Sequence, residues 1–293
     1  MKLGIIGGSG LYQLDGLTDI REEVMKTPFG DPSDAFIHGR LGGVEIFFLP
    51  RHGRGHRILP SEINNRANIW GFKKLDVECV LSVSAVGSLR EGIRPRDIVL
   101  PDQYFDRTKS SRNHTFFGDG IVGHVSFGDP ACGIFRDLIA TVVTEAIGEL
   151  KLGDVVRLHK GGTYVNMEGP AFSTRAESNV YRSMGFDIIG MTSLPEAKLC
   201  REAEICYQAM SMSTDYDCWR SSEAEVSVEM IIATLTSNVK LAKDVIRRLV
   251  ARLPQTRQCA CEHALKYAIM TDMKTVPAKT LAALEPLLAK YTK

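Results

Sequence analysis

Five basic side chains crowd the segment 51–57, which follows an apolar run ending at Pro50. They are Arg51, His52, Arg54, His56 and Arg57. Guanidinium groups bind phosphate oxygens bidentately, and an imidazole can add a further hydrogen bond. Two intervening glycines disfavour a helix, so the histidines do not form a zinc-protease motif. The segment therefore suits phosphate binding at a strand end, with a solvated surface loop as the alternative.

Small and hydroxyl-bearing residues end three other apolar segments. They include Ser9 in a glycine-rich turn, Ser84 with Ala85, and Thr192. Small side chains let backbone N–H groups and hydroxyls approach an anion closely. The turn around Ser9 lacks the Gly-Lys-Ser/Thr ending of a Walker A loop and the spacing of a dinucleotide fingerprint. Taken alone, each of these segments also fits a tight turn or close packing.

Two carboxylates, Asp215 and Asp217, follow the apolar segment 205–212. In extended chain, residues two apart point to the same side. Such a pair can bind an amine, bind a metal or exchange protons, and burial would raise the pKa of one member. For Asp217 the alternative is a helix N-cap, a position that aspartate favours.

Seven cysteines are scattered along the chain, which is no secreted disulfide framework. Cys259 and Cys261, with His263 close behind, suggest a metal site at first sight. No second ligand pair stands at a zinc-like spacing, so we expect no metal here. A local redox role for the two cysteines stays open.

Short apolar segments alternate with helical patterns along the chain. We expect buried strands at residues 3–6, 44–49, 77–83, 163–167, 187–191 and 205–212. A helix start is predicted at Pro60, and amphipathic helices over 135–147 and 228–249, with a mostly helical C-terminal third. The alternation predicts an α/β fold with a largely parallel or mixed sheet and no linker between domains. Residues 102–130 are predicted to form a long functional loop.

Charge and composition exclude several classes of protein. The 293 residues carry 36 basic and 35 acidic side chains, a net charge of +1 that argues against nucleic-acid binding. A hydrophobic content of 44% is enough to build a substantial core. We expect no signal peptide, no membrane span and a cytoplasmic location.

Taken together and in order, these motifs resemble the 5′-methylthioadenosine phosphorylase branch of the trimeric purine nucleoside phosphorylase family. The matching segments are 4–11, 51–56, 84–97, 102–108, 168–177, 191–196 and 214–219. The resemblance implies one nucleoside phosphorylase domain over 1–293, with a helical C-terminal segment from about 254. It implies a central mixed, distorted barrel-like β-sheet flanked by helices.

The implied reaction is phosphorolysis of an N-glycosidic bond. Methylthioadenosine and phosphate would give adenine and 5-methylthioribose 1-phosphate, a step of purine and methionine salvage. Phosphate is then a co-substrate, and neither a metal nor an organic cofactor is needed. The family forms a homotrimer whose sites lie near subunit interfaces.

The resemblance also assigns residues. Phosphate would be held by Ser9, Arg51, His52, Ser84, the backbone of Ala85 and Thr192, with Arg51, His52 and Asp215 in catalytic roles. The nucleoside would meet Met191 at the ribose, Phe172 at the purine face, and His124 from a neighbouring subunit. Ser173, Val226 and Val228 match positions that set preference for the 5′-methylthio group.

The aspartates would read the edge of the purine. A protonated Asp215 could donate to N7, and an ionised carboxylate accepts a hydrogen bond from the 6-amino group of adenine. Relatives that use 6-oxopurines usually carry asparagine at this position, so Asp215 favours adenine. Gly190 and Val86 depart from the family pattern, since relatives commonly have asparagine and a small or sulfur-bearing residue there.

Two other functions remain to be weighed. One is a phosphorylase for 6-oxopurine nucleosides or methylthioinosine, against which the Asp215 and Asp217 pair argues. The other is a non-catalytic purine-binding module, which would have no need of the phosphate residues.

Overall fold

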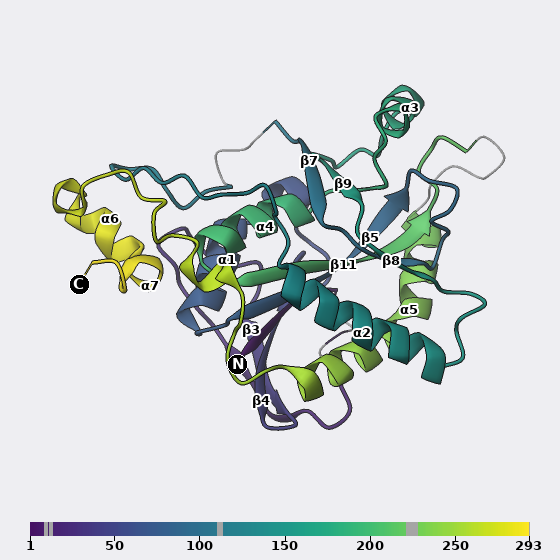
Figure 1. Ribbon diagram of the computed structural model, residues 1–293, viewed down its shortest axis with the longest axis horizontal. Coiled ribbons are helices and arrows are strands. Elements are labelled where there is room, and N and C mark those ends of the chain that lie inside the picture. Colours follow the sequence, from purple (N-terminus) through teal and green to yellow (C-terminus); the bar gives the residue numbers. More distant parts are fainter. Residues whose placement is uncertain (9–10, 12–13, 110–113, 221–227, 293) are drawn as a thin grey trace.

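A mixed β-sheet runs through the centre of the molecule, with helices on both of its faces (Figure 1). The computed structural model describes the chain except residues 9–10, 12–13, 110–113, 221–227 and 293, and it describes the side chains of α5 from residue 239 onward. The strands are β1 (Leu3–Gly7), β2 (Thr18–Glu23), β3 (Phe36–Leu41), β4 (Val44–Pro50), β5 (Cys79–Ser88), β6 (Ile98–Leu100), β7 (Gln103–Arg107), β8 (Leu158–Lys160), β9 (Thr163–Met167), β10 (Ile188–Gly190) and β11 (Cys206–Asp215). The helices are α1 (Asn65–Lys74), α2 (Gly133–Glu149), α3 (Arg175–Ser183), α4 (Ser193–Glu202), α5 (Val228–Arg252), α6 (Ala278–Ala283) and α7 (Glu285–Leu288), with 3-10 turns η1 (Pro60–Glu62), η3 (Ala260–His263) and η4 (Met273–Thr275).

The sheet branches at β5. Its main path runs β2-β3-β4-β1-β5-β10-β9-β7, while β11 pairs with β5 and leads on to β6 and β8. The four central strands β1, β4, β5 and β11 are parallel, so their carboxyl ends meet at one edge. That shared edge is where an α/β sheet presents its functional residues.

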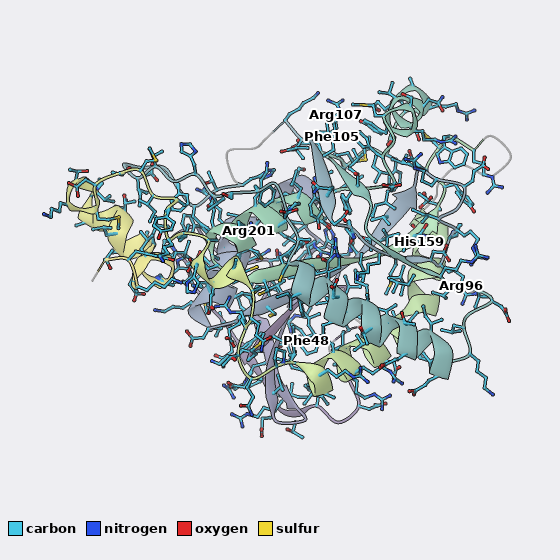
Figure 2. All side chains as sticks on the ribbon, in the orientation of Figure 1. Phe48, Arg96, Phe105, Arg107, His159 and Arg201 are labelled. Carbon is cyan, nitrogen blue, oxygen red and sulfur yellow. The ribbon has the colours of Figure 1, made fainter. Side chains whose placement is uncertain are left out.

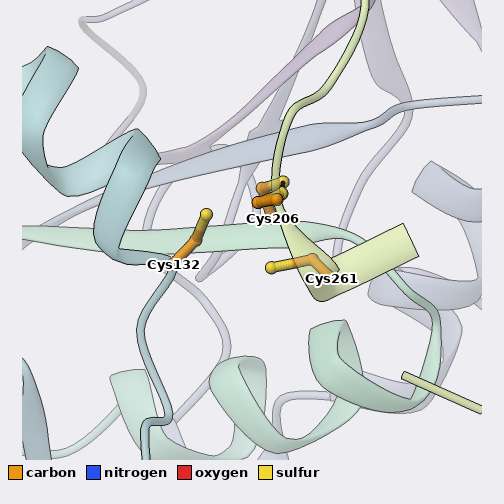
Figure 3. Close-up of side chains that lie close together, drawn as sticks. Cys132, Cys206 and Cys261 are labelled. Carbon is orange, nitrogen blue, oxygen red and sulfur yellow. Dashed lines mark hydrogen bonds between the residues drawn. The ribbon is translucent and has the colours of Figure 1, made fainter. Parts of the chain in front are cut away.

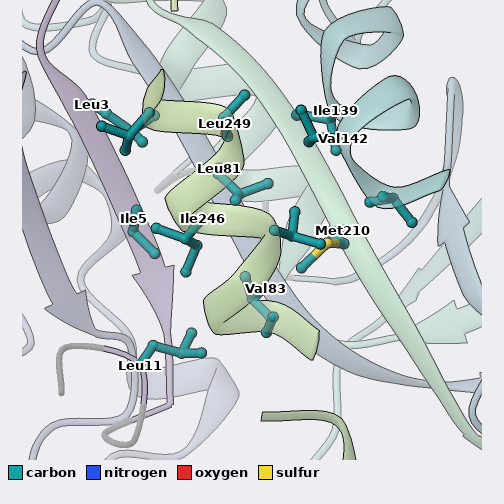
Figure 4. Packing of buried hydrophobic residues seen from close by; sticks show 14 of the residues in the cluster. Leu3, Ile5, Leu11, Leu81, Val83, Ile139, Val142, Met210, Ile246 and Leu249 are labelled. Atoms are coloured by element: carbon teal, nitrogen blue, oxygen red, sulfur yellow. The ribbon is translucent and has the colours of Figure 1, made fainter. Parts of the chain in front are cut away.

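Alternating side chains along the central strands feed two separate cores. Leu3 and Ile5 of β1 pack with α2 and the described part of α5, as Figure 4 shows for Ile139 and Ile246. The next residue along the strand, Ile6, packs on the opposite face, with α1, α4 and the C-terminal segment. Strands buried on both faces read as continuous apolar runs, which explains why the sequence marks them clearly.

The predicted mixed sheet flanked by helices is confirmed, as are the six buried strands and the helices α2 and α5. At Pro60 the chain forms only the 3-10 turn η1, and α1 begins at Asn65 because the Asn64 side chain caps it, accepting from the Ala67 N–H. The expected loop 102–130 contains the edge strand β7, whose mostly exposed residues carry no apolar pattern. Beyond residue 254 the described chain has two 3-10 turns and two short helices.

Two helices next to the site escaped the sequence analysis although their start signals were visible. Thr174 and Glu177 form a capping box at the start of α3, with hydrogen bonds in both directions. A first-turn proline and Glu196 mark the start of α4. Both helices follow strands by only a few residues, so their signals were hidden among the candidate site residues.

Two helical glycines separate backbone preference from packing. At Gly71 of α1 and at Gly148 of α2, an alanine would have a higher helix propensity than the glycine. A Cβ on Gly71 would meet the Phe36 ring at 2.5 Å, whereas one on Gly148 meets nothing within 4 Å. We expect Gly71→Ala to lower the free energy of unfolding by about 1–3 kcal/mol, since the core is overpacked. Gly148→Ala should raise it by up to about 1 kcal/mol. Urea denaturation measures both, and equal effects of the two variants would contradict the packing argument.

Candidate active site

The predicted phosphate residues and the aspartate pair come together at the carboxyl edge of the central strands. Arg51 follows β4, Ser84 lies on β5, Thr192 follows β10, and Asp215 ends β11. Arg51 N–H donates to the Gly7 carbonyl at the end of β1, 3.2 Å away, so β1 and β4 end together. The register of β11 on β5 places Asp215 opposite Gly87. One edge of the sheet therefore collects side chains that are far apart in sequence.

Arg51 is locked into a buried ion pair with Glu196 of α4. The Arg51 Nε lies 2.5 Å from Glu196 Oε1, and its other nitrogens donate to Ser82 Oγ (2.6 Å) and the Val83 carbonyl (3.2 Å). Tyr207 donates to Glu196 Oε2 from β11, 2.8 Å away. Burial opposes the charge on Arg51, but Glu196 outweighs it and the pKa of Arg51 is raised. The guanidinium is a fixed positive charge beneath the site edge.

His52 is half-buried and uncharged at neutral pH. Its Nδ1 lies 2.8 Å from the Ile58 carbonyl, so Nδ1 carries the proton and Nε2 can accept. Burial, and after it the charge of Arg51, lowers the pKa of His52 to about 4. The ring stacks on His56 at a centroid distance of 4.3 Å. In this state His52 can accept a hydrogen bond from a protonated oxygen, and a nearby anion would raise its pKa.

The remaining basic residues of the segment have other partners. Arg54 contacts Asp34 and Glu22 on the surface, and Arg57 donates to the Ser33 carbonyl 3.3 Å away. The basic segment is thus divided. Arg51 and His52 face the interior, and the surface-loop alternative holds for Arg54.

Hydroxyl groups without internal partners stand at the same edge. Ser84 Oγ is buried and makes no hydrogen bond, and the Ser193 hydroxyl is in the same state at the start of α4. Thr192 occupies the N-cap position of α4 but does not cap it with its side chain. The positive end of the α4 dipole therefore points at these hydroxyls. Orphaned donors beside a helix N-terminus suit an incoming anion.

Asp215 and Asp217 form a close pair with different surroundings. Asp215 accepts from the Thr214 hydroxyl and from the Asp217 N–H, each at 2.7 Å, and such bonds favour the ionised form. Burial, and with it the charge of Asp215, raises the pKa of Asp217. Asp217 Oδ2 is buried without a hydrogen-bond partner. Asp217 lies in a turn with φ of 50°, so it is not the helix N-cap of the alternative reading.

A glycine makes room for this pair. A Cβ on Gly87 would lie 3.0 Å from Asp215 Oδ1 and 3.3 Å from Asp217 Cβ. Both contacts are tighter than ordinary packing, so a side chain at Gly87 would push the carboxylates apart. The absence of a side chain at position 87 of β5 therefore allows the two aspartates to lie where they do.

The loop after β9 borders the aspartates. A Cβ on Gly169 would meet Met191 Sδ at 2.6 Å, so the loop lies directly against Met191. The Ser173 carbonyl accepts from Cys218 Sγ at 3.2 Å, which ties the loop to the turn that carries Asp217. The Phe172 ring is 46% exposed and available to a flat ligand.

The adjoining edge strand β7 is anchored to α3, which follows this loop. Arg107 Nε lies 3.3 Å from Tyr181 Oη of α3, and Figure 2 labels Arg107 and Phe105 on β7, to the left of that helix. This contact positions α3 beside the sheet edge.

Gly190 and Val86, the two residues that depart from the family pattern, lie within contact distance of each other and beside Tyr164. A Cβ on Gly190 would lie 2.0 Å from the Tyr164 hydroxyl and 3.3 Å from Val86 Cγ1. Tyr164 is completely buried, and its hydroxyl has no hydrogen-bond partner. The Tyr164 side chain thus fills the space that an asparagine at 190 would need.

Four predicted residues are not brought to this edge or lie outside the description. His124 is exposed on a segment that pairs with the C-terminal region through its N–H to the Ala268 carbonyl. Ser9 and Val226 fall outside the described residues, as does the side chain of Val228.

Sequence reasoning missed the residues that hold the site together. Glu196 binds Arg51, Tyr207 binds Glu196, and the Asn166 side chain accepts the Leu194 N–H of α4 at 3.1 Å. All three are buried polar groups, and buried polar groups need partners. Glu196 close to a helix start was a visible signal, but its partner 145 residues away was not.

The fold and the site define an α/β enzyme of the nucleoside phosphorylase type, with unpartnered hydroxyls beside a close pair of aspartates. The profile of the Phosphorylase superfamily matches residues 2–251, and the chain belongs to this family. Similar proteins include the S-methyl-5′-thioadenosine phosphorylases of Geobacter sulfurreducens (55% identical, 99% of this chain, 98% of that one) and Thermosynechococcus vestitus (57%, 99% of both).

Solved structures resemble the whole fold. A methylthioadenosine phosphorylase from an antarctic soil metagenomic library superposes with a TM-score of 0.91 at 46% identity, over 98% of both chains. A methylthioadenosine phosphorylase from Schistosoma mansoni in complex with adenine gives a TM-score of 0.78 at 35% identity, over 86% of this chain and 91% of that one.

The Arg51–Glu196 pair leads to a stability prediction. Glu196→Gln leaves the buried Arg51 charge uncompensated, so we expect the free energy of unfolding to fall by about 3–5 kcal/mol. The control is Glu22→Gln, which removes a carboxylate from the solvent-exposed ion pair with Arg54. That variant should change stability little, because water screens the pair. Urea denaturation of both variants is the measurement, and an equally small change in both would refute the structural role of the buried pair.

Proposed function

We propose that this protein is a methylthioadenosine phosphorylase, which uses phosphate to cleave the N-glycosidic bond and releases adenine and 5-methylthioribose 1-phosphate. The observation that carries the proposal is the meeting of unpartnered hydroxyls with the Asp215 and Asp217 pair at one sheet edge. The hydroxyls suit an anion, and the aspartate pair suits the edge of a base. The names of the similar proteins agree with both.

Phosphate is proposed to bind Ser84 Oγ, the Ala85 backbone and Thr192, with the outer ring nitrogen of His52 accepting from a phosphate hydroxyl. Ser9 completes the set from outside the described residues. Arg51 is committed to Glu196, so its part is to hold positive charge and position β5 below the anion. It also bonds the Val83 carbonyl, next to Ser84. The reaction then needs no organic cofactor, because phosphate is the co-substrate.

Bond cleavage builds positive charge on the ribosyl group and negative charge on the purine. The phosphate anion stabilises the first and then attacks C1′ from below the sugar. The second is neutralised by a proton to N7, for which the proposed acid is the aspartate pair. Burial and the charge of Asp215 raise the pKa of Asp217, so this carboxyl is the proposed proton store of the pair. Asp215, the residue at the end of β11, passes it to the base or reads the 6-amino group.

Substrate preference follows from hydrogen bonding and apolar contact. A carboxylate accepts from a 6-amino group, whereas a 6-oxo group would leave two buried acceptors facing each other. Met191 is proposed to contact the ribose and the Phe172 ring, which is exposed, the purine. Ser173, Val226 and Val228 are proposed to border the methylthio group.

Three wider features belong to the proposal. Exposed His124 and Phe172 suit a site completed by a neighbouring subunit, so we propose a homotrimer. All seven cysteines are free, which suits the reducing cytoplasm. No helix in the described part of the chain is long and apolar enough to cross a membrane. The proposed role is salvage of the purine and methionine moieties.

The direct test is product formation from methylthioadenosine with and without phosphate, with adenosine and inosine in parallel. We expect adenine only when phosphate is present, and little turnover of inosine. Adenine without phosphate would mean hydrolysis and would remove the phosphate site. Inosine turnover equal to that of methylthioadenosine would favour a 6-oxopurine enzyme, and no product from any substrate would favour a binding module.

Asp215→Asn separates base reading from general acid catalysis. An amide can donate to a 6-oxo group, so we expect the ratio of inosine to adenosine turnover to rise. Methylthioadenosine turnover should fall about 10²–10⁴-fold, because the proton path is lost. The control is Asp137→Asn, which changes an exposed carboxylate on α2 and should leave kcat and KM unaltered. An equal loss for every substrate would show that Asp215 does not read the base.

A further inference from the structure

Four cysteines converge at the end of the sheet opposite the candidate active site. The sulfurs of Cys132, Cys206, Cys259 and Cys261 all lie within 4.8 Å of one another. Cys132 precedes α2, Cys206 begins β11, and the other two belong to the C-terminal segment around η3. In Figure 3 the labelled thiols point toward a common centre. Sequence spacing found no second ligand pair because the two partners lie 53 and 127 residues before Cys259 (259 − 206 and 259 − 132).

The cluster has the size of a tetrahedral metal site. Zinc–sulfur bonds of about 2.3 Å put the four sulfurs about 3.8 Å apart. The sulfurs here already lie within 4.8 Å of one another, and those of Cys206 and Cys259 are 3.2 Å apart. Shifts of less than about 1 Å would therefore complete the coordination sphere.

The backbone holds two ligands in register. The Cys132 N–H donates to the Tyr207 carbonyl at 3.0 Å, so the segment before α2 is tied to the start of β11. Cys132 is the N-cap residue of the 17-residue helix α2, and its side chain makes no cap hydrogen bond. Cys132 therefore lies at the positive end of that helix. Cys132 and Cys206 are buried, and Cys259 and Cys261 are partly buried.

A basic side chain lies next to the cluster. Four thiols that bind a divalent ion release four protons and leave a net charge of −2. The Arg257 guanidinium lies beside Cys206. Its Nε is buried without a hydrogen-bond partner, 3.8 Å from Glu78 Oε1. Arg257 also lies 4.0 Å from Glu262 Oε2 and donates to the Glu204 carbonyl, so it joins the cluster to the acidic groups around it.

We propose that Cys132, Cys206, Cys259 and Cys261 form a closed tetrathiolate site for one divalent metal ion of the zinc type. Four sulfur ligands of tetrahedral arrangement select such ions and leave no open position, so the site is structural. It lies at the first residue of β11, whereas Asp215 is the last. The metal therefore takes no part in the proposed phosphorolysis.

The site would fasten the C-terminal segment to the sheet. After Cys261 this segment crosses to the other core, where Leu265, Leu284 and Leu287 are buried. It also pairs with residues 122–124, the stretch that carries His124. Metal loss should loosen both regions while the strand ends at the active site keep their positions.

Metal analysis of the reduced full chain, purified without chelator, tests the proposal. We expect one zinc ion per chain, and visible absorption bands of tetrahedral thiolate coordination when Co²⁺ replaces it. Cys259→Ser and Cys261→Ser should lose the bound zinc, melt at a lower temperature and become sensitive to protease beyond residue 254. The control is Cys79→Ala, which removes a buried cysteine paired with Cys206 but outside the cluster, and it should keep the zinc.

Three results would overturn the site. The first is reduced wild-type protein that binds neither Zn²⁺ nor Co²⁺. The second is a zinc content that is unchanged in Cys259→Ser. The third is a protein mass lower by two hydrogens for each disulfide that these cysteines form. If a ligand variant does not fold, the Co²⁺ spectrum of the wild-type protein decides. The phosphate-dependence assay is independent of these measurements, so failure of one does not imply failure of the other.

Discussion

The buried ion pair between Arg51 and Glu196 is the constraint on which the site edge depends. It joins the end of β4 to α4, and through Ser82 and Tyr207 it includes β5 and β11. A charge at this depth is stable only while its partner and hydrogen bonds are in place. The four elements must therefore keep one relative position. That requirement leaves Ser84 and Ser193 at a common edge, with hydroxyls that have no hydrogen-bond partner.

Polar side chains below the edge and at the edge differ in their hydrogen bonding. Below the edge, Ser82, Glu196 and Tyr207 are hydrogen-bonded within the Arg51 network. At the edge, Ser84 Oγ and Asp217 Oδ2 are buried without hydrogen-bond partners. Buried polar groups without partners cost free energy, so a folded protein tolerates them mainly where a ligand will supply the bond. Their position beside an electropositive helix end and a paired acid is the basis of the proposal that one edge binds both phosphate and a purine.

Strand β11 links the two ends of the molecule. Its last residue, Asp215, belongs to the aspartate pair, and its first, Cys206, belongs to the cysteine cluster. The strand is buried along its whole length and packs between α4 and the α2–α5 layer. Chemistry at one end and fixation of the C-terminal segment at the other are thus separated by a rigid element. The same separation accounts for a metal site that leaves the reaction untouched.

The sequence by itself determined the buried strands, the mixed α/β fold and the residue types at the strand ends, because apolar runs and glycine turns are local signals. It also carried the ordered motifs that resemble the phosphorylase family. Only the tertiary structure decided that Glu196 pairs with Arg51, that Tyr164 fills the space above Gly190, and that four distant cysteines meet. The physical reason is that ion pairs, side-chain contacts and ligand sets depend on separation in space, which the spacing of residues along the chain does not encode.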